Sequence, residues 1–112
     1  MNRFKYALQG MLTLLKKDHK FLLHLIIAII VIICGFIVNI TITEWFFIIF
    51  AIGLVLAFEA INTAVELVVD LVTSDYHILA KNAKDIAAFS VCLVSIVAFI
   101  IGIIIFCPYI FK

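Results

Sequence analysis

The chain has 112 residues, of which 68% are hydrophobic and 13% charged, and its mean hydropathy is +1.38. Water-soluble domains are about half apolar and about a quarter charged, and a chain this short has too little interior to bury the excess. The composition therefore excludes an ordinary soluble domain, and the net charge of +1 excludes a basic surface for nucleic acid, so we expect lipid around most of the chain and no nucleic-acid partner.

The first twenty residues combine scattered charges with a stripe of apolar side chains. The stripe follows the spacing i, i+4, i+7, i+11 of one helical face and consists of Phe4, Leu8, Met11 and Leu15. We predict an amphipathic helix over about residues 2–18 that lies in the membrane interface, for which a surface anchor is the simplest role. The charges interrupt the apolar core that a cleavable signal peptide requires, so we expect no signal peptide here.

Three apolar stretches follow, and we predict that they form membrane-spanning helices over about residues 21–42, 45–72 and 86–107. A spanning helix needs about 20 apolar residues. The third stretch is the cleanest, and Pro108 is expected to stop its helix. The first two are shorter as uninterrupted runs, so that each also fits a buried core helix, but their apolar flanks favour spans. The predicted fold is all-α and integral to the membrane, with residues 1–112 as a single domain.

The basic residues are distributed unevenly among the segments outside these spans. All but one of them precede the first span or lie between the second and the third: Arg3, Lys5, Lys16, Lys17, Lys20, Lys81 and Lys84. The turn between the first two spans has none, and the C-terminus has only Lys112. Because Lys and Arg are enriched in cytoplasmic loops, we predict a plasma-membrane protein whose N-terminus and second loop are cytoplasmic and whose C-terminus is outside.

Four polar residues line one face of the second span: Glu59, Asn62, Glu66 and Asp70. At about 100° per residue they fall within roughly 80° of arc. Counted from Trp45 at 1.5 Å per residue, Glu59 lies about 21 Å along the helix, within the hydrocarbon, and Glu66 about 31 Å, at the cytoplasmic headgroups. Asp70 reaches the headgroups as well.

A lone carboxylate in lipid costs about 2.5–3.5 kcal/mol, so the row of acids requires a partner or a function. One interpretation is structural, in which the acids pair with Lys20, Lys81 or Lys84 and hold the helices together. The length of the row favours a functional role. For Asp70 alone, the structural and the functional interpretation are equally well supported.

Acids at headgroup depth next to a basic loop indicate phosphate chemistry at the interface. Mg²⁺ is typically bound by one or two carboxylates plus substrate phosphates. The four glycines are too few for a Walker A or glycine-rich kinase loop, so metal and lysine would have to hold the phosphates. A proton or cation path is an alternative, as in a small multidrug-type exporter, but that class needs four spans. A non-catalytic adaptor would leave the depth of Glu59 unexplained.

The segment EAINTAVELVVD at residues 59–70 resembles the signature of the small prokaryotic diacylglycerol kinase family at all its fixed positions. The resemblance continues through SDYH at residues 74–77 and AKNAKD at residues 80–85, and Tyr6 with Gly10 resembles the family's surface helix. It covers nearly the whole chain. Within the family, the chain is most similar to the Gram-positive-type undecaprenol kinases.

This resemblance implies a homotrimer of three-span protomers with shared active sites at the cytoplasmic surface. It implies that Glu59 is the general base, that Asn62 and Asp70 support the site, and that Mg²⁺ accompanies ATP as the phosphoryl donor. Glu66 is implied as one metal ligand, and Asp18 occupies the position of a second, where the family usually has Glu. The ATP-binding residues that the resemblance implies are Tyr6, Asp18, Glu66, Asp75, Tyr76, His77, Lys84 and Asp85.

The sequence thus predicts an ATP- and Mg²⁺-dependent lipid kinase that phosphorylates undecaprenol to undecaprenyl phosphate. Diacylglycerol is the alternative acceptor, since the preference rests on the similarity to the subgroup alone. His77 is equally well explained as an ordinary exposed loop histidine. Thr63 and Ala64 are small residues suited to close helix packing, for example at a trimer contact.

Overall fold

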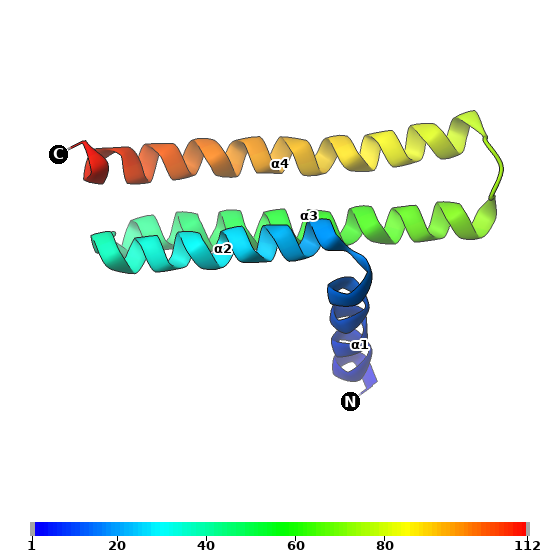
Figure 1. The fold of residues 1–112 in the computed structure, drawn as a ribbon, viewed down its shortest axis with the longest axis horizontal. Coiled ribbons are helices and arrows are strands. Elements are labelled where there is room, and N and C mark those ends of the chain that lie inside the picture. Colours follow the sequence, from blue (N-terminus) through cyan, green and yellow to red (C-terminus); the bar gives the residue numbers. More distant parts are fainter. Residues whose placement is uncertain (1, 112) are drawn as a thin grey trace.

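The structure is a computed structural model that describes residues 2–111, and the elements in this range are four α-helices. Helix α1 spans Asn2–Lys17, α2 His19–Val38, α3 Ile42–Val72 and α4 Ile78–Ile110. Helices α2, α3 and α4 run along the long axis of the molecule, and α1 projects away from them at the start of α2 (Figure 1). Each of the three long helices is apolar enough to cross a membrane, which confirms the all-helical prediction with three candidate spans.

The three long helices differ in length, and this difference positions the polar residues. Helix α2 has 20 residues and is about 30 Å long, which equals the thickness of a bilayer's hydrocarbon core. Helices α3 and α4 have 31 and 33 residues, or about 46 and 50 Å. The C-terminal part of α3 and the N-terminal part of α4 therefore extend past the point where α2 begins (Figure 1).

The bend between α1 and α2 is made by one residue, Asp18. Its backbone is extended, with φ −110° and ψ 98°, and its side chain accepts hydrogen bonds from the backbone N–H groups of Lys20 at 3.0 Å and Phe21 at 3.2 Å. An aspartate at this N-cap position satisfies two of the free N–H groups that begin a helix. The aspartate therefore both ends α1 and starts α2.

The turn between α2 and α3 is three residues long. Asn39 ends α2 with φ 56° and ψ 59°, a left-handed conformation that asparagine tolerates better than most residues. Thr41 then begins α3 through a capping box, in which its hydroxyl accepts from the N–H of Glu44 and the Glu44 carboxylate accepts from the N–H of Thr41. The chain thus leaves α2 before residue 42, earlier than predicted, and enters α3 at Ile42.

Helix α4 is longer at both ends than the sequence suggested. It begins at Ile78, where the His77 side chain accepts from the N–H of Leu79 at 3.1 Å, rather than near residue 86. The prediction that Pro108 stops the helix is wrong, because the helix continues to Ile110. Proline removes one helical hydrogen bond, but the last turn is still closed by the N–H of Phe111 bonding to the Cys107 carbonyl at 2.9 Å.

A tight contact between α2 and α3 lies next to their connecting turn. Trp45 packs over Gly35, and a Cβ atom at Gly35 would lie 2.7 Å from Cη2 of Trp45 and 3.2 Å from Cδ1 of Ile40. The rings of Phe36 and Trp45 are tilted against each other with centroids 4.9 Å apart. The buried residues of the nearby core are Ile40, Ile48 and Ile105. Glycine at position 35 therefore lets the two helices approach closely at this end.

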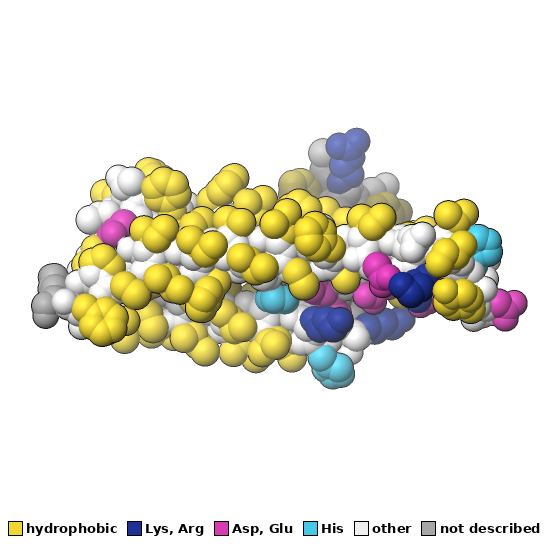
Figure 2. Space-filling model, turned by 90° about the horizontal axis from the view of Figure 1, so that it is seen from above, with side chains coloured by type: hydrophobic (Ala, Val, Ile, Leu, Met, Phe, Trp, Pro, Cys, Tyr) yellow, Lys and Arg dark blue, Asp and Glu magenta, His cyan; other side chains and the backbone are white. Residues whose placement is uncertain are grey.

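Elsewhere the long helices expose most of their apolar side chains. Figure 2 shows hydrophobic side chains over much of the visible face, with Lys, Asp, Glu and His gathered mainly in one half of it. The buried hydrophobic residues of the described chain are few: Ala28, Ile40, Ile48, Ala51 and Ile105. An apolar exterior of this extent suits lipid or a neighbouring protein chain rather than water.

We predict that Gly35→Ala lowers the stability of the protein, because the ring of Trp45 has to move and overpacking of this kind costs about 1–3 kcal/mol. Gly53→Ala on α3 is the matched control, since no described atom lies within 4 Å of the added Cβ. There, alanine should be neutral or stabilising by up to about 1 kcal/mol. Thermal unfolding of both variants in the same detergent provides the measurement, and equal melting temperatures would contradict the close contact.

Candidate active site

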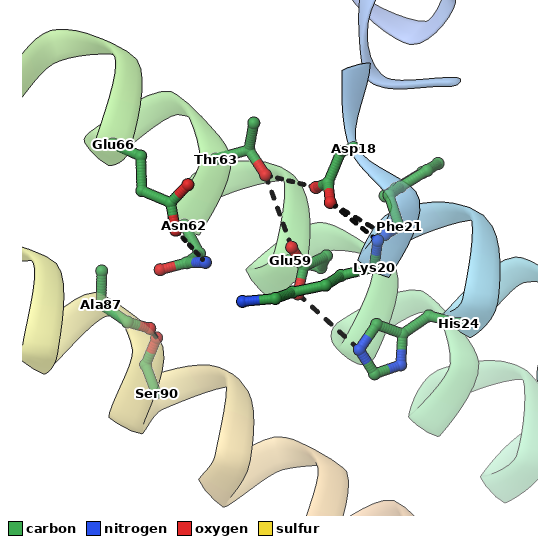
Figure 3. A network of polar contacts seen from close by, with 10 residues as sticks. All are labelled: Asp18, Lys20, Phe21, His24, Glu59, Asn62, Thr63, Glu66, Ala87 and Ser90. Carbon is green, nitrogen blue, oxygen red and sulfur yellow. Dashed lines mark hydrogen bonds and ion pairs between the residues drawn. The ribbon is translucent and has the colours of Figure 1, made fainter. Parts of the chain in front are cut away.

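The most deeply buried polar side chains lie on one face of α3. Glu59 is 2% exposed and Asn62 is 4% exposed, and in the described part of the chain they are the buried polar or charged residues. Figure 3 shows them between α2 and α4, with the start of α2 on one side and Ala87 and Ser90 of α4 on the other. Of the row of polar residues predicted from the sequence, Glu59 and Asn62 therefore point into the bundle, and Glu59 is almost free of solvent contact.

Each carboxylate oxygen of Glu59 has its own polar neighbour. Oε2 lies 3.4 Å from the hydroxyl of Thr63, one helical turn further along α3. Oε1 lies 3.7 Å from Nε2 of His24 on α2. Lys20 of α2 extends across Glu59 in Figure 3 and interacts with it electrostatically. Glu59 is thus contacted by polar groups from two helices, as a carboxylate among apolar residues requires.

Asp18 joins this group from the bend between α1 and α2. Its Oδ1 atom caps α2, and its Oδ2 atom accepts a hydrogen bond from the Thr63 hydroxyl. Partial burial would raise the pKa of Asp18, but its hydrogen bonds, including those from Thr63 and from the backbone N–H of Phe21, outweigh this effect and lower the pKa below the usual 3.8. Asp18 is therefore ionised at neutral pH, as a metal ligand must be.

Asn62 connects the buried acid to the outer part of the row. Its Nδ2 group donates to Oε1 of Glu66 at 3.3 Å. Its Oδ1 atom is buried and has no hydrogen-bond partner in the described part of the chain. An unsatisfied buried acceptor is costly, so this oxygen is available to a hydroxyl, an amino group or a water molecule that enters the site.

A groove of about 760 Å³ opens beside this cluster, between α1, the start of α2 and α3. Its charged lining residues are Lys17, Asp18, Glu66 and Asp70. Apolar side chains from α1 and α3 line the rest, among them Leu14 and Leu56. The groove therefore places two of the acids that the sequence singled out for metal binding, Asp18 and Glu66, against one open volume.

The donor set fits Mg²⁺ held jointly with phosphates. Among residues 2–111, no three His, Cys, Asp or Glu side chains lie close enough to form a metal site by themselves. Mg²⁺ does not require such a cage, because it is commonly bound by one or two carboxylates, water and substrate phosphates. Asp18 and Glu66 are hard oxygen donors that line one groove, which is suitable for an ion that arrives with a nucleotide.

Further along α3 and α4, the charged residues form exposed ion pairs. Nζ of Lys84 lies 2.7 Å from Oδ1 of Asp70, which joins α4 to α3. Nζ of Lys81 lies 2.7 Å from Oδ2 of Asp85, one turn along α4. Asp70 therefore forms the ion pair with a lysine that the structural interpretation of the acidic row predicts. Lysine has three N–H donors, so Lys84 also retains two for other acceptors.

The remaining residues implied in ATP binding lie at the edge of this region. Asp75, Tyr76 and His77 form the loop between α3 and α4, where Asp75 N–H donates to the Thr73 hydroxyl at 3.2 Å and the Tyr76 ring is exposed. Tyr6 lies on α1 with an exposed ring. The structure thus brings Asp18, Glu59, Asn62 and Glu66 into one cluster, and it places Tyr6 and the loop outside it.

Comparison with known proteins identifies the family. Residues 5–106 match the family model described as prokaryotic diacylglycerol kinase. The chain is 42% identical over 105 residues to the undecaprenol kinase of Bacillus subtilis (strain 168), an alignment that covers 94% of this chain and 85% of that protein. The chain belongs to the prokaryotic diacylglycerol kinase family. It is also 37% identical over 101 residues to the diacylglycerol kinase of Haemophilus influenzae, covering 87% of this chain and 86% of the relative.

Membership of the prokaryotic diacylglycerol kinase family confirms the resemblance seen in the sequence and makes the protein a lipid kinase. With three described helices long and apolar enough to cross a bilayer, the kinase is a multi-pass membrane protein. Membership of this family also excludes the alternative of a small multidrug-type exporter.

Two residues of the kinase's buried cluster were not recognised from the sequence as parts of a site. His24, which flanks the first span, was taken for a residue of the membrane interface, and Thr63 was taken for a packing residue, yet both contact Glu59. The position of Thr63, four residues after Glu59, places it on the same helical face and was an available signal. The contact of His24 depends on how α2 packs against α3. No spacing of residues in a single sequence indicates that packing.

We predict that the two exposed ion pairs contribute little to the stability of the kinase. Asp70→Asn and Asp85→Asn each remove one member of a pair whose acid is 62% exposed, and each should change the free energy of unfolding by less than about 1 kcal/mol. Melting temperatures in detergent test this. A large drop for Asp70→Asn alone would show that its pair holds α3 to α4, whereas lost turnover at an unchanged melting temperature would assign Asp70 to the reaction.

Proposed function

We propose that this kinase transfers the γ-phosphoryl group of ATP, with Mg²⁺, to the hydroxyl of undecaprenol and releases undecaprenyl phosphate. The observation that carries the proposal is the buried Glu59 beside a groove that contains Asp18 and Glu66. Such an arrangement suits a water-insoluble alcohol that meets a phosphate donor from solution. The similarity to the undecaprenol kinase of Bacillus subtilis supports the choice of acceptor.

In this proposal Glu59 is the general base. The lipid hydroxyl approaches Glu59, its oxygen bonds to the γ-phosphorus, the bond between that phosphorus and the bridging oxygen of ADP breaks, and the hydroxyl proton passes to the Glu59 carboxylate. The free Oδ1 atom of Asn62 is one turn from Glu59 and is able to accept a hydrogen bond from an entering group. A positioned base of this kind accelerates a reaction by about 10²–10⁴-fold.

Asp18 and Glu66 would hold the Mg²⁺ ion that accompanies ATP. The bound ion would supply positive charge to the phosphates of ATP, and phosphoryl transfer depends on such charge stabilisation together with positioning. Lys84, with its two remaining N–H donors, would contact the nucleotide together with Asp85 and the loop of Asp75, Tyr76 and His77. Tyr6 would reach the nucleotide from α1. Asp70 supports this arrangement by holding Lys84.

The acceptor's hydrocarbon chain has a suitable place beside Glu59. A second cavity, of about 460 Å³, lies among α2, α3 and α4 and is lined almost entirely by apolar side chains. His24, the neighbour of Glu59, and Leu56, which also lines the first groove, belong to its lining. A lipid tail in this cavity would bring its hydroxyl toward Glu59.

We further propose that the site faces the cytoplasm of the plasma membrane, with the C-terminus outside, and that the kinase is a homotrimer. The basic residues gathered near the site support this orientation through the positive-inside rule. Helix α1 exposes the apolar residues Phe4, Leu8 and Met11, which suits an amphipathic helix on the membrane surface. The exposed apolar faces of α2, α3 and α4 leave room for neighbouring protomers as well as lipid.

We expect Glu59→Gln to retain nucleotide binding and to lower turnover by roughly 10²–10⁴-fold, because the amide cannot accept the proton. ATP consumption in mixed micelles, measured with and without a lipid alcohol, gives turnover, and titration with a fluorescent nucleotide gives binding. Glu44→Gln is the control, since Glu44 begins the same helix at the opposite end from the site. Near-normal turnover of Glu59→Gln would remove Glu59 from the role of base.

Side-by-side turnover on undecaprenol and diacylglycerol in the same micelles tests the acceptor. We expect a higher kcat/KM for undecaprenol, and Mg²⁺-dependent ATP consumption only when a lipid alcohol is present. A preference for diacylglycerol would retain the mechanism and correct the substrate, making phosphatidic acid the product.

A further inference from the structure

The hydroxyl of Thr63 lies between two acids that come from distant parts of the chain. It hydrogen-bonds to Oδ2 of Asp18 and lies 3.4 Å from Oε2 of Glu59 (Figure 3). We propose that Thr63 is a positioning residue of the kinase, whose hydroxyl fixes the metal-binding acid relative to the general base. The inference rests on the roles proposed above for Asp18 and Glu59.

The atoms of Asp18 show why this bridge matters. Oδ1 is used by the N–H groups of Lys20 and Phe21 to cap α2, so Oδ2 is the oxygen that faces the cluster. That oxygen accepts a hydrogen bond from the Thr63 hydroxyl of α3, and the side chain of Asp18 also interacts directly with the carboxyl group of Glu59. Without the hydroxyl, the side chain of Asp18 would still cap α2, but its second oxygen would lose the hydrogen bond that holds it between Thr63 and Glu59.

Glu59 is oriented by the same hydroxyl. Thr63 is one turn beyond Glu59 on α3, and its hydroxyl lies near Oε2, while His24 lies near Oε1 from the side of α2. A carboxylate with neighbours at both oxygens has a restricted rotation about its side-chain bonds. Thr63 therefore acts on two acids at once, and His24 acts on Glu59 alone.

The chemistry of a hydroxyl makes this position informative. A threonine hydroxyl has one hydrogen and two lone pairs, so it donates to only one carboxylate at a time. Rotation about the Cβ–Oγ1 bond turns the hydrogen from Asp18 toward Glu59 without moving the helix. A cation that occupies Oδ2 of Asp18 would therefore free the hydroxyl to donate to Glu59, which connects the occupancy of the metal site to the orientation of the base.

The functional consequence follows from geometry. Phosphoryl transfer requires the γ-phosphate, held through the metal acids, and the lipid hydroxyl, held by the base, to be in contact and aligned. A displacement of about 1 Å between such groups costs up to about 10²-fold in rate. Loss of the bridge should consequently lower kcat and metal affinity, and leave the binding of the lipid tail, which other residues provide, unchanged.

Thr63→Val tests the proposal, because valine keeps the shape of threonine and lacks the hydroxyl. We expect a fall of about 10–100-fold in kcat and weaker binding of Mn²⁺ in the presence of a non-hydrolysable ATP analogue, measured by electron paramagnetic resonance. The KM for the lipid alcohol should stay unchanged. Thr63→Ser, which restores a hydroxyl, should recover most of both losses.

Thr43→Val on the same helix is the matched control, since Thr43 lies at the opposite end of α3. Wild-type kcat and Mn²⁺ affinity in Thr63→Val would overturn the proposal. Thr63→Ala provides a second hydroxyl-free variant on a good helix former. If both hydroxyl-free variants fail to fold while Thr63→Ser folds, the hydroxyl serves the fold and the proposal is wrong. An unaltered chain without lipid-stimulated ATP turnover would instead refute the proposed function itself.

Discussion

A carboxyl group among apolar helices has to be surrounded by polar neighbours, and Glu59 determines where those neighbours lie. The side chain is almost fully buried on α3, and the structure places His24 of α2, Thr63 of α3 and, through Thr63, Asp18 around it. These contacts connect residues 18–24 with residues 59–63, two segments that are far apart in the sequence. The contacts that pack α2 against α3 near the bend are consequently also the contacts that bring the site residues together.

The structure also places the buried acid and the two acids proposed to bind metal beside different cavities. His24, the neighbour of the deepest acid, lines a cavity of mostly apolar lining, whereas Asp18 and Glu66 line a groove at the level where α2 begins and α3 continues past it. This division matches the proposed reaction between a lipid and a charged, water-soluble donor, because the groove includes four charged side chains and the lining of the second cavity is almost entirely apolar. A lipid kinase needs such a boundary, and here the difference in length between α2 and α3 creates it.

Much of this arrangement was predictable from one sequence, and the reasons are local. Long apolar runs define the spans, and the spacing of Glu59, Asn62 and Glu66 places them on one helical face without any knowledge of the packing. The start of α4 was missed because Lys81, Lys84 and Asp85 interrupt the apolar run in its first two turns. The effect of Pro108 was misjudged because a proline near a helix end removes one hydrogen bond without unwinding the last turn.

The contacts of the site were less predictable, because they depend on how helices are placed in space. Asp18 and Thr63 are separated by 45 residues, and no periodicity relates them. The contact of His24 with Glu59 was missed for the same reason. For Asp70 the sequence left two interpretations open, and the observed pair with Lys84 supplies the structural one without excluding a part in the reaction.

The close contact at Gly35 and Trp45 has a consequence at the far end of α2. It fixes the register of α2 against α3 next to their connecting turn, so α2 works as a spacer of set length between that turn and Asp18. One residue inserted into α2 would rotate Asp18 by about 100° around the helix axis and shift it by about 1.5 Å. The number of residues in an otherwise featureless apolar helix is thereby tied to whether two acids meet.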